Sequence, residues 1–157
     1  MMYQDVFKAL NKEKIKYLVI GGMAVNLYGF TRMTLDLDLL ISLDELNKVK
    51  FYKIMKYLKY KTKKRKLAEN ILLHSNNPKN IKVVTFYRNE FELIDVFVEN
   101  PINFNKAYKD KKMFKYNKIN IPTLPLNLLI DMKRKIGRER DLIDAGYLDD
   151  IRKIKKK

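Results

Sequence analysis

Hydrophobic and polar positions follow two different periods along this chain, and each change of period marks an expected helix or strand. Apolar residues at helical spacing predict helices over 3–14, 23–28, about 44–58, 102–112, 123–136 and about 139–153. Runs rich in β-branched and aromatic residues predict strands over 17–20, 35–41, 81–88 and 91–98, and a short hairpin over 113–122. This order is typical of an α/β or α+β domain with a mixed β-sheet backed by helices.

Turn residues set the expected ends of these elements. Gly29 and Gly137 each follow a helical pattern and are expected to end it. Asn89-Glu90 separates two strand-like runs and predicts a hairpin, and Asn117-Lys118 is the expected tip of another. The basic run Lys59–Lys66 fits either a solvated helix end or loop, or a patch that contacts phosphate.

Length and composition indicate one folded domain. The 157 residues are enough to bury a core, and neither a repeat nor a linker divides them. We expect one domain over 1–157, with a core over about 15–100 and a C-terminal hairpin and helices over about 101–157. The absence of cysteine excludes disulfides and thiolate metal sites, which suits a reducing cytosol. No signal peptide or apolar membrane-spanning run is present, so a cytoplasmic protein without a membrane partner is expected.

The charge balance is strongly basic. Lys and Arg number 34 against 18 acids, which gives a formal net charge of +16. Such a surplus indicates a polyanionic partner such as RNA, or a bias of composition toward Lys, Ile and Asn. The sequence is rich in all three residues, so both explanations remain open.

Two carboxylates follow a glycine pair in the stretch 17–42, YLVIGGMAVNLYGFTRMTLDLDLLIS. Asp36 and Asp38 are two residues apart, so on a strand both side chains point to one face. Magnesium takes oxygen ligands and is bound by one or two carboxylates plus substrate phosphates. The pair therefore predicts a site for Mg²⁺ or Mn²⁺.

The residues around these acids predict phosphate binding. Gly21 and Gly22 lack a Cβ, so their N–H groups can come close to a phosphate. The helix that follows adds the positive end of its dipole. Arg32 and Thr34 lie just before the acids and can reach triphosphate oxygens.

Asp95 is the best candidate for a third carboxylate. Its neighbours in Leu93–Phe97 are apolar, and an acid there is costly to bury unless it is paired or binds metal. Two-metal phosphoryl-transfer sites use such a clustering of ligands. Any one of the three acids could be an exposed strand residue, but three in apolar strands behind a glycine turn favour a site.

A glycine pair, thirteen residues, D-x-D and a distant acid within an apolar strand resemble the polymerase-β-like nucleotidyltransferase superfamily. The local sequence IGGMAVNLYGFTRMTLDLDLLI is most similar to its small bacterial and archaeal members, the minimal nucleotidyltransferases and the abortive-infection toxin group. Lys133, Arg138, Asp141 and Asp144 match a K-x4-R-x2-D-x2-D signature that many of these proteins carry after the core. The resemblance covers about residues 15–150.

The resemblance implies an α/β nucleotidyltransferase fold with a C-terminal helical segment, and it implies a role for each candidate residue. Asp36, Asp38 and Asp95 would be catalytic and bind metal, with Asp95 helping to activate the attacking hydroxyl. The nucleotide-binding residues would be Gly21, Gly22, Arg32, Thr34 and Lys133. Arg138, Asp141 and Asp144 could instead be salt-bridge partners that pack helices. Many members carry Gly-Ser where this chain has Gly21-Gly22.

The implied reaction is metal-dependent transfer of a nucleoside monophosphate from an NTP such as ATP to a hydroxyl. An RNA end, particularly a tRNA 3′ end, suits the basic charge best as acceptor. A partner protein in a toxin–antitoxin system comes second and a small aminoglycoside-like molecule third. The main alternative is a non-catalytic antitoxin or RNA-binding module that retains the fold. The sequence leaves the oligomeric state open.

Overall fold

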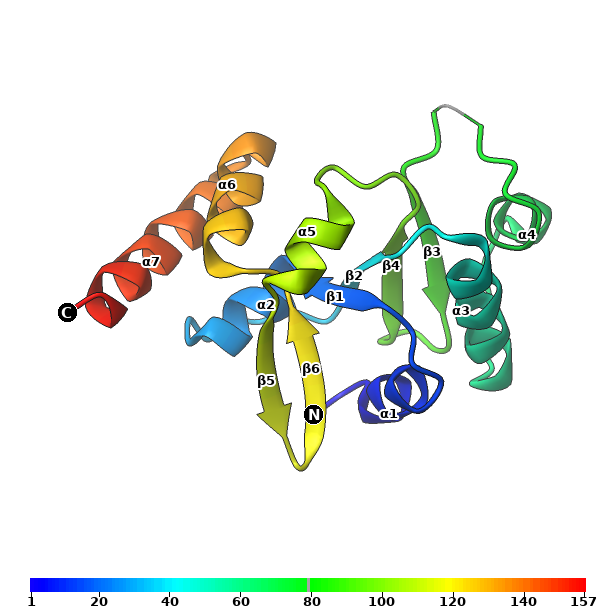
Figure 1. The fold of residues 1–157 in the computed structure, drawn as a ribbon, viewed down its shortest axis with the longest axis horizontal. Helices are drawn as coiled ribbons and strands as arrows, with labels where there is room; N and C mark the ends of the chain where they lie inside the picture. The colour runs from blue at the N-terminus through cyan, green and yellow to red at the C-terminus, as the bar shows by residue number, and fades with distance from the viewer. Residues whose placement is uncertain (79) are drawn as a thin grey trace.

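The structure of this chain is a computed structural model, which describes residues 1–78 and 80–157 (Figure 1). In these residues the strands form one sheet in the order β3-β4-β2-β1-β6-β5. The strands are β1 (Tyr17–Ile20), β2 (Leu37–Ile41), β3 (Val83–Tyr87), β4 (Leu93–Phe97), β5 (Lys112–Tyr116) and β6 (Ile119–Thr123). The helices are α1 (Gln4–Lys12), α2 (Gly21–Tyr28), α3 (Glu45–Tyr57), α4 (Arg65–Leu73), α5 (Phe104–Lys109), α6 (Leu126–Ile136) and α7 (Glu139–Lys155).

The sheet mixes parallel and antiparallel pairs. β1 and β2 are antiparallel, and β2 then pairs in parallel with β4 across the middle of the sheet. β1 pairs in parallel with β6, and the two hairpins β3–β4 and β5–β6 are antiparallel. The predicted mixed sheet with helices and a helical C-terminal end is confirmed.

The two faces of the β3–β4 hairpin have different surroundings. Val84 and Phe86 are buried, and the Phe86 ring lies 6.1 Å from that of Phe51 on α3. Because side chains alternate along a strand, Val83 and Thr85 point to the opposite face, and both are exposed. Helices therefore cover one face of this hairpin and leave the other open.

The last two helices lie side by side at the opposite end of the molecule from α3 and α4 (Figure 1). Gly137 ends α6 with a φ of +72°, as its position predicts. α7 then returns along α6 and reaches α2, and the Tyr147 ring stacks on Phe30 with 4.0 Å between centroids. This docking brings the C-terminal signature to the connector between α2 and β2.

Two local predictions were wrong. The region after the basic run forms the helix α4, which was not predicted, although Leu67, Ala68, Ile71 and Leu72 are spaced for one apolar face. The loop between β3 and β4 spans residues 88–92, where the sequence predicted a two-residue turn at Asn89-Glu90. An asparagine side chain builds this loop, because Asn89 Oδ1 accepts hydrogen bonds from the N–H groups of Phe91 and Glu92.

The other predicted hairpin is confirmed. Asn117 and Lys118 have φ angles of +45° and +66°, the left-handed pair that a two-residue type I′ turn requires. In the described part of the chain, no helix is both long and apolar enough to cross a membrane.

Candidate active site

Three carboxylates gather on the open face of the sheet. Asp38 of β2 and Asp95 of β4 are register partners on neighbouring parallel strands, so their side chains stand on the same face. Asp36 lies one residue before β2, whereas the sequence predicted it inside the strand. We call Asp36, Asp38 and Asp95 the acid cluster.

The acid cluster concentrates negative charge that nearby cations offset only in part. Burial raises the pKa of Asp38 to about 6, and the nearby charges of Asp95 and Asp36 add to the effect. Lys133 and Arg138 oppose the shift without cancelling it. A cation bound beside Asp38 would stabilise the charged form of its carboxylate.

Thr85 holds the third acid in place. Its hydroxyl donates a hydrogen bond of 2.5 Å to Asp95 Oδ1 from the register-partner position on β3. Sequence reasoning missed this residue, because the two-residue turn expected at 89–90 would have paired Thr85 with Ile94.

Gly21 lies directly against the acid cluster. Its φ is +66°, and a Cβ built on it would lie 2.0 Å from Asp38 Oδ2. The position therefore needs glycine for two reasons, its left-handed backbone and the carboxylate that occupies the space of a side chain.

Gly22 makes room for a different pair of side chains. A Cβ there would lie 2.7 Å from Thr34 Oγ1 and 2.8 Å from Arg32 Nη2. The sequence predicted that Gly22 leaves space for a phosphate, but in this structure side chains of the same chain occupy it.

The C-terminal signature forms a chain of ion pairs. Arg32 Nη2 donates to Asp144 Oδ2 at 2.9 Å, and Lys133 Nζ lies 3.0 Å from Asp144 Oδ2 and 3.0 Å from Asp141 Oδ1. Arg138 Nε donates to Asp141 Oδ2 at 2.7 Å. We call Arg32, Lys133, Arg138, Asp141 and Asp144 the ion-pair network. Its two acids and Lys133 are buried, so the helix-packing role considered for Asp141 and Asp144 has a structural basis.

A cavity of about 520 Å³ joins the acid cluster to the ion-pair network. All eight residues predicted for the site line it, namely Gly21, Gly22, Arg32, Thr34, Asp36, Asp38, Asp95 and Lys133. Arg138, Arg140 and the apolar side chains of Val83, Phe97, Met132 and Ile136 also line it. The sequence did not predict Arg140 as a site residue, because it lies inside the signature at a position that the signature does not specify.

Solved structures match nearly the whole chain. LnuA, a lincosamide antibiotic adenylyltransferase solved with lincomycin bound, has a TM-score of 0.63 at 15% identity, covering 94% of this chain and 94% of its own. TM1012 of Thermotoga maritima, assigned as a nucleotidyltransferase, has a TM-score of 0.58 at 17% identity, covering 94% and 90%. ANT(2″)-Ia, solved with adenylyl-2″-tobramycin, has a TM-score of 0.57 at 12% identity, covering 91% and 82%.

The chain has the nucleotidyltransferase fold. The fold expected from the motifs is thereby confirmed. No protein-family model matches the sequence, and no curated protein matches it.

The acid cluster of this nucleotidyltransferase fold suits a hard divalent cation in its donor chemistry. Carboxylate oxygens are the ligands that Mg²⁺ and Mn²⁺ take, and burial together with the neighbouring acids Asp95 and Asp36 raises the pKa of Asp38. In the residues that the structure describes, no three His, Cys, Asp or Glu side chains form a ready-made metal cage. The residues present thus fit an ion that substrate phosphates help to bind.

Proposed function

We propose that this protein transfers a nucleoside monophosphate from an NTP to a hydroxyl group. The observation that carries the proposal is the register pairing of Asp38 with Asp95, which sets two acids side by side where Gly21 begins α2. Asp36 joins them at a cavity of about 520 Å³ that also holds basic side chains. Uncompensated acids beside cations suit a metal-bound triphosphate.

The reaction is an in-line displacement at the α-phosphorus. The acceptor oxygen forms a bond to that phosphorus while the bond to the oxygen bridging the α- and β-phosphates breaks. Pyrophosphate leaves with the electron pair of the broken bond, and the proton of the acceptor hydroxyl passes to the Asp95 carboxylate. Thr85 donates to Asp95 Oδ1 and keeps the other oxygen free for this proton.

Asp36 and Asp38 would hold the divalent metal, Mg²⁺ or Mn²⁺, together with Asp95. A bound metal supplies positive charge that offsets the charge developing on the phosphate oxygens. Asp38 orients its carboxylate against the backbone of Gly21, which has no side chain to displace it. The N-terminal end of α2 therefore lies beside Asp38, where its dipole would favour bound phosphates.

The basic residues divide into two groups. Arg32 and Lys133 were predicted to contact the nucleotide, but their charges are already paired with Asp144 and Asp141. Their proposed contribution is a positive potential along the cavity wall. Arg138 and Arg140 are exposed, although Arg138 is also paired with Asp141, and we propose that both contact the triphosphate directly.

The acceptor is the open part of the proposal. The sequence favoured an RNA or tRNA end, then a cognate toxin or antitoxin protein in the cytoplasm, and last a small molecule. The structures of LnuA and ANT(2″)-Ia contain lincomycin and adenylyl-2″-tobramycin, so a small molecule enters the same test. A non-catalytic antitoxin or RNA-binding module is the alternative, and it predicts no transfer to any of these acceptors.

The decisive experiment incubates the protein with Mg²⁺ and each α-labelled NTP, and offers bulk RNA, a protein lysate, lincomycin or tobramycin. Wild type should label one acceptor class, and Asp38→Asn should reduce the label by about 10³-fold because it removes a metal ligand. Asp150→Asn makes the same chemical change at an exposed position on α7 and should label as wild type does. Equal labelling by Asp38→Asn and wild type, or no transfer by wild type, would contradict the proposal.

A further inference from the structure

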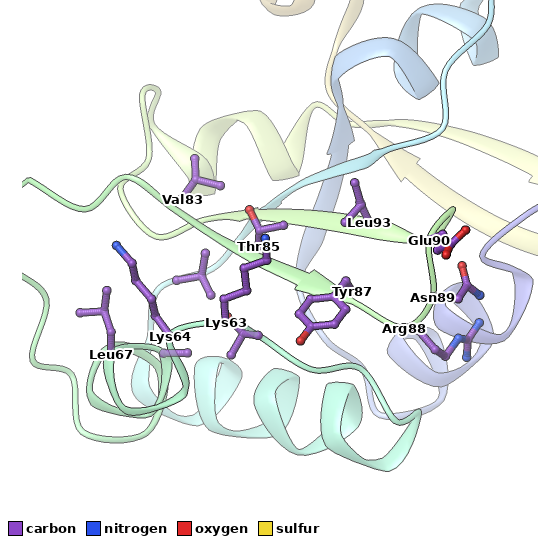
Figure 2. A pocket seen from close by; sticks show the side chains of 13 residues that line it. Lys63, Lys64, Leu67, Val83, Thr85, Tyr87, Arg88, Asn89, Glu90 and Leu93 are labelled. Atoms are coloured by element: carbon purple, nitrogen blue, oxygen red, sulfur yellow. The ribbon is translucent and has the colours of Figure 1, made fainter.

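A second and larger groove runs along β3, at the edge of the sheet (Figure 2). Its volume is about 960 Å³, and its walls are β3, the residues Lys63 and Lys64 before α4, and Leu67 of α4. No step of the proposed transfer uses this groove.

The backbone of β3 is unpaired along part of this edge. On the side of β4, the carbonyl of Lys82 accepts a hydrogen bond from the N–H of Val98. On the outer side, Tyr87 exchanges two backbone hydrogen bonds of 2.8 Å with Lys61. Because backbone groups alternate sides along an antiparallel strand, Val84 and Phe86 bond to β4, and Val83 and Thr85 face outward. Within the described residues, nothing pairs with the outward groups of Val83 and Thr85.

The connector from α3 begins as the next strand of the sheet and then leaves it. Lys61 forms a single bridge to Tyr87, and the chain then turns away into α4. The space it leaves beside Val83 and Thr85 is the groove. An added strand would continue the sheet from where Lys61 stops.

The walls of the groove suggest the chemistry of its occupant. Leu67 and Ala68 of α4 and Val84 of β3 give it an apolar side. Lys63 and Lys64 are exposed, make no ion pair with any residue the structure describes, and point to the side of β3 that carries Thr85 (Figure 2). An occupant with alternating apolar and acidic side chains complements both walls.

The groove borders the cavity that holds the acid cluster. Val83 lines both cavities, and Thr85, which lines the groove, is hydrogen-bonded to Asp95. A side chain on a strand paired with β3 would therefore stand within the same open face as the three acids.

We propose that this groove binds an extended, acidic segment of a partner protein, which adds to the edge of β3 as a further strand. The unpaired N–H and C=O groups of Val83 and Thr85 are the donors and acceptors that such a segment needs. RNA would use the lysines but leave these backbone groups and the apolar wall unmatched. The same segment would also supply the acceptor hydroxyl, through a serine, threonine or tyrosine. This second role rests on the proposed nucleotidyl transfer.

The probe is a blocked, fluorescent peptide of about seven residues in which glutamate alternates with valine around a central serine. Binding is measured by anisotropy without NTP or metal, so that it does not depend on catalysis. Hydrogen exchange of the Val83 and Thr85 amides is followed by NMR in the same samples. Binding should slow exchange at these two amides and leave the Val84 amide, already in the ladder, unchanged.

The key variant is Val83→Pro, which removes one outward N–H and should therefore abolish peptide binding. The β3–β4 pairing should survive, because the N–H that bonds to β4 belongs to the neighbouring Val84. Val83→Thr retains the N–H and should bind as wild type does. The double variant Lys63→Glu/Lys64→Glu should weaken binding by about tenfold or more. Lys8→Glu/Lys12→Glu makes the same charge change on exposed positions of α1 and should have little effect.

The docking proposal is overturned if the peptide does not bind, if Val83→Pro binds as well as Val83→Thr, or if the two amides gain no protection. It is also overturned if a single-stranded oligouridylate binds in place of the peptide and loses affinity in the lysine double variant. With Mg²⁺ and NTP added, label on the central serine supports the acceptor role. A protein that labels another acceptor but not the bound peptide overturns that role, whereas a protein that labels nothing contradicts the proposed function.

Discussion

The acid cluster and the ion-pair network line one cavity, but the carboxylates of the network are paired with cations and those of the cluster lie next to one another. In the network each buried carboxylate has a cation within 3.0 Å. In the cluster, burial and the like charges of Asp95 and Asp36 raise the pKa of Asp38. A buried pair that satisfies itself holds helices together, whereas a group of acids that repel one another needs an ion from outside.

The glycine pair forms the boundary between these two groups. Gly21 lies against Asp38 of the acid cluster, and Gly22 lies against Arg32 of the ion-pair network. At Gly21 the Asp38 carboxylate and the left-handed backbone require glycine, whereas at Gly22 the Thr34 hydroxyl and the Arg32 guanidinium occupy the space of a side chain. The motif therefore does more than expose backbone to a phosphate.

The sharpest test of the contrast removes one carboxylate from each group. Asp144→Asn should destabilise the fold by about 3–5 kcal/mol, because it leaves the buried Lys133 and the half-buried Arg32 with less compensating charge. Asp38→Asn should keep or raise the unfolding midpoint, because it removes repulsion and the cost of burying a charge. Thermal unfolding without metal measures both, and equal losses of stability would show that the two groups do not differ in this way.

Magnesium sharpens the same test. It should raise the unfolding midpoint of wild type and of Asp144→Asn, by binding the folded state, and should not raise that of Asp38→Asn.

A smaller effect is expected at the glycine that faces the acid cluster. Gly21→Ala should cost about 1–3 kcal/mol and weaken Mg²⁺ binding, because the methyl group meets Asp38 and the φ of +66° disfavours a side chain. Gly146→Ala is the control, since that position is helical and open, and alanine there should stabilise by about 0.5–1 kcal/mol. Urea unfolding and calorimetric titration with Mg²⁺ measure the two effects. An unperturbed Gly21→Ala would mean that Asp38 does not depend on this close approach.

The smallest expected effect is the pH dependence of the ion-pair network. Burial acts to raise the pKa of Asp141, but hydrogen bonds from Arg138 and Lys133 outweigh it and hold the pKa below its usual value. A lowered folded-state pKa contributes stability above the unfolded value, about 4, and this contribution disappears as the pH falls below it. The unfolding midpoint of wild type should therefore fall more steeply between about pH 5 and pH 3 than that of Asp141→Asn. Parallel slopes would exclude Asp141 as a source of acid sensitivity.

Local patterns predicted most of the elements because each depends on neighbouring residues. The apolar run before Gly21, the turn at Asn117-Lys118 and the stop at Gly137 all appear where the sequence places them. The helix α4 was not predicted because its first residues, Arg65 and Lys66, belong to the basic run, which fits a loop as well as a helix end. The β3–β4 loop was misjudged because an asparagine side chain, rather than a two-residue turn, sets its length.

The sequence motif predicted the three acids and the glycine pair as a site and correctly predicted the fold, because residue type and spacing carry that information. Which acids face a common cavity depends on the register between β2 and β4, two strands more than fifty residues apart, and a shift of one residue would turn Asp95 to the other face. The same holds for Arg32 and Lys133, whose partners lie on α7 and become known only when that helix docks. Spacing along the chain predicts which groups are available, but packing decides which of them neutralise one another and which remain free to bind a substrate.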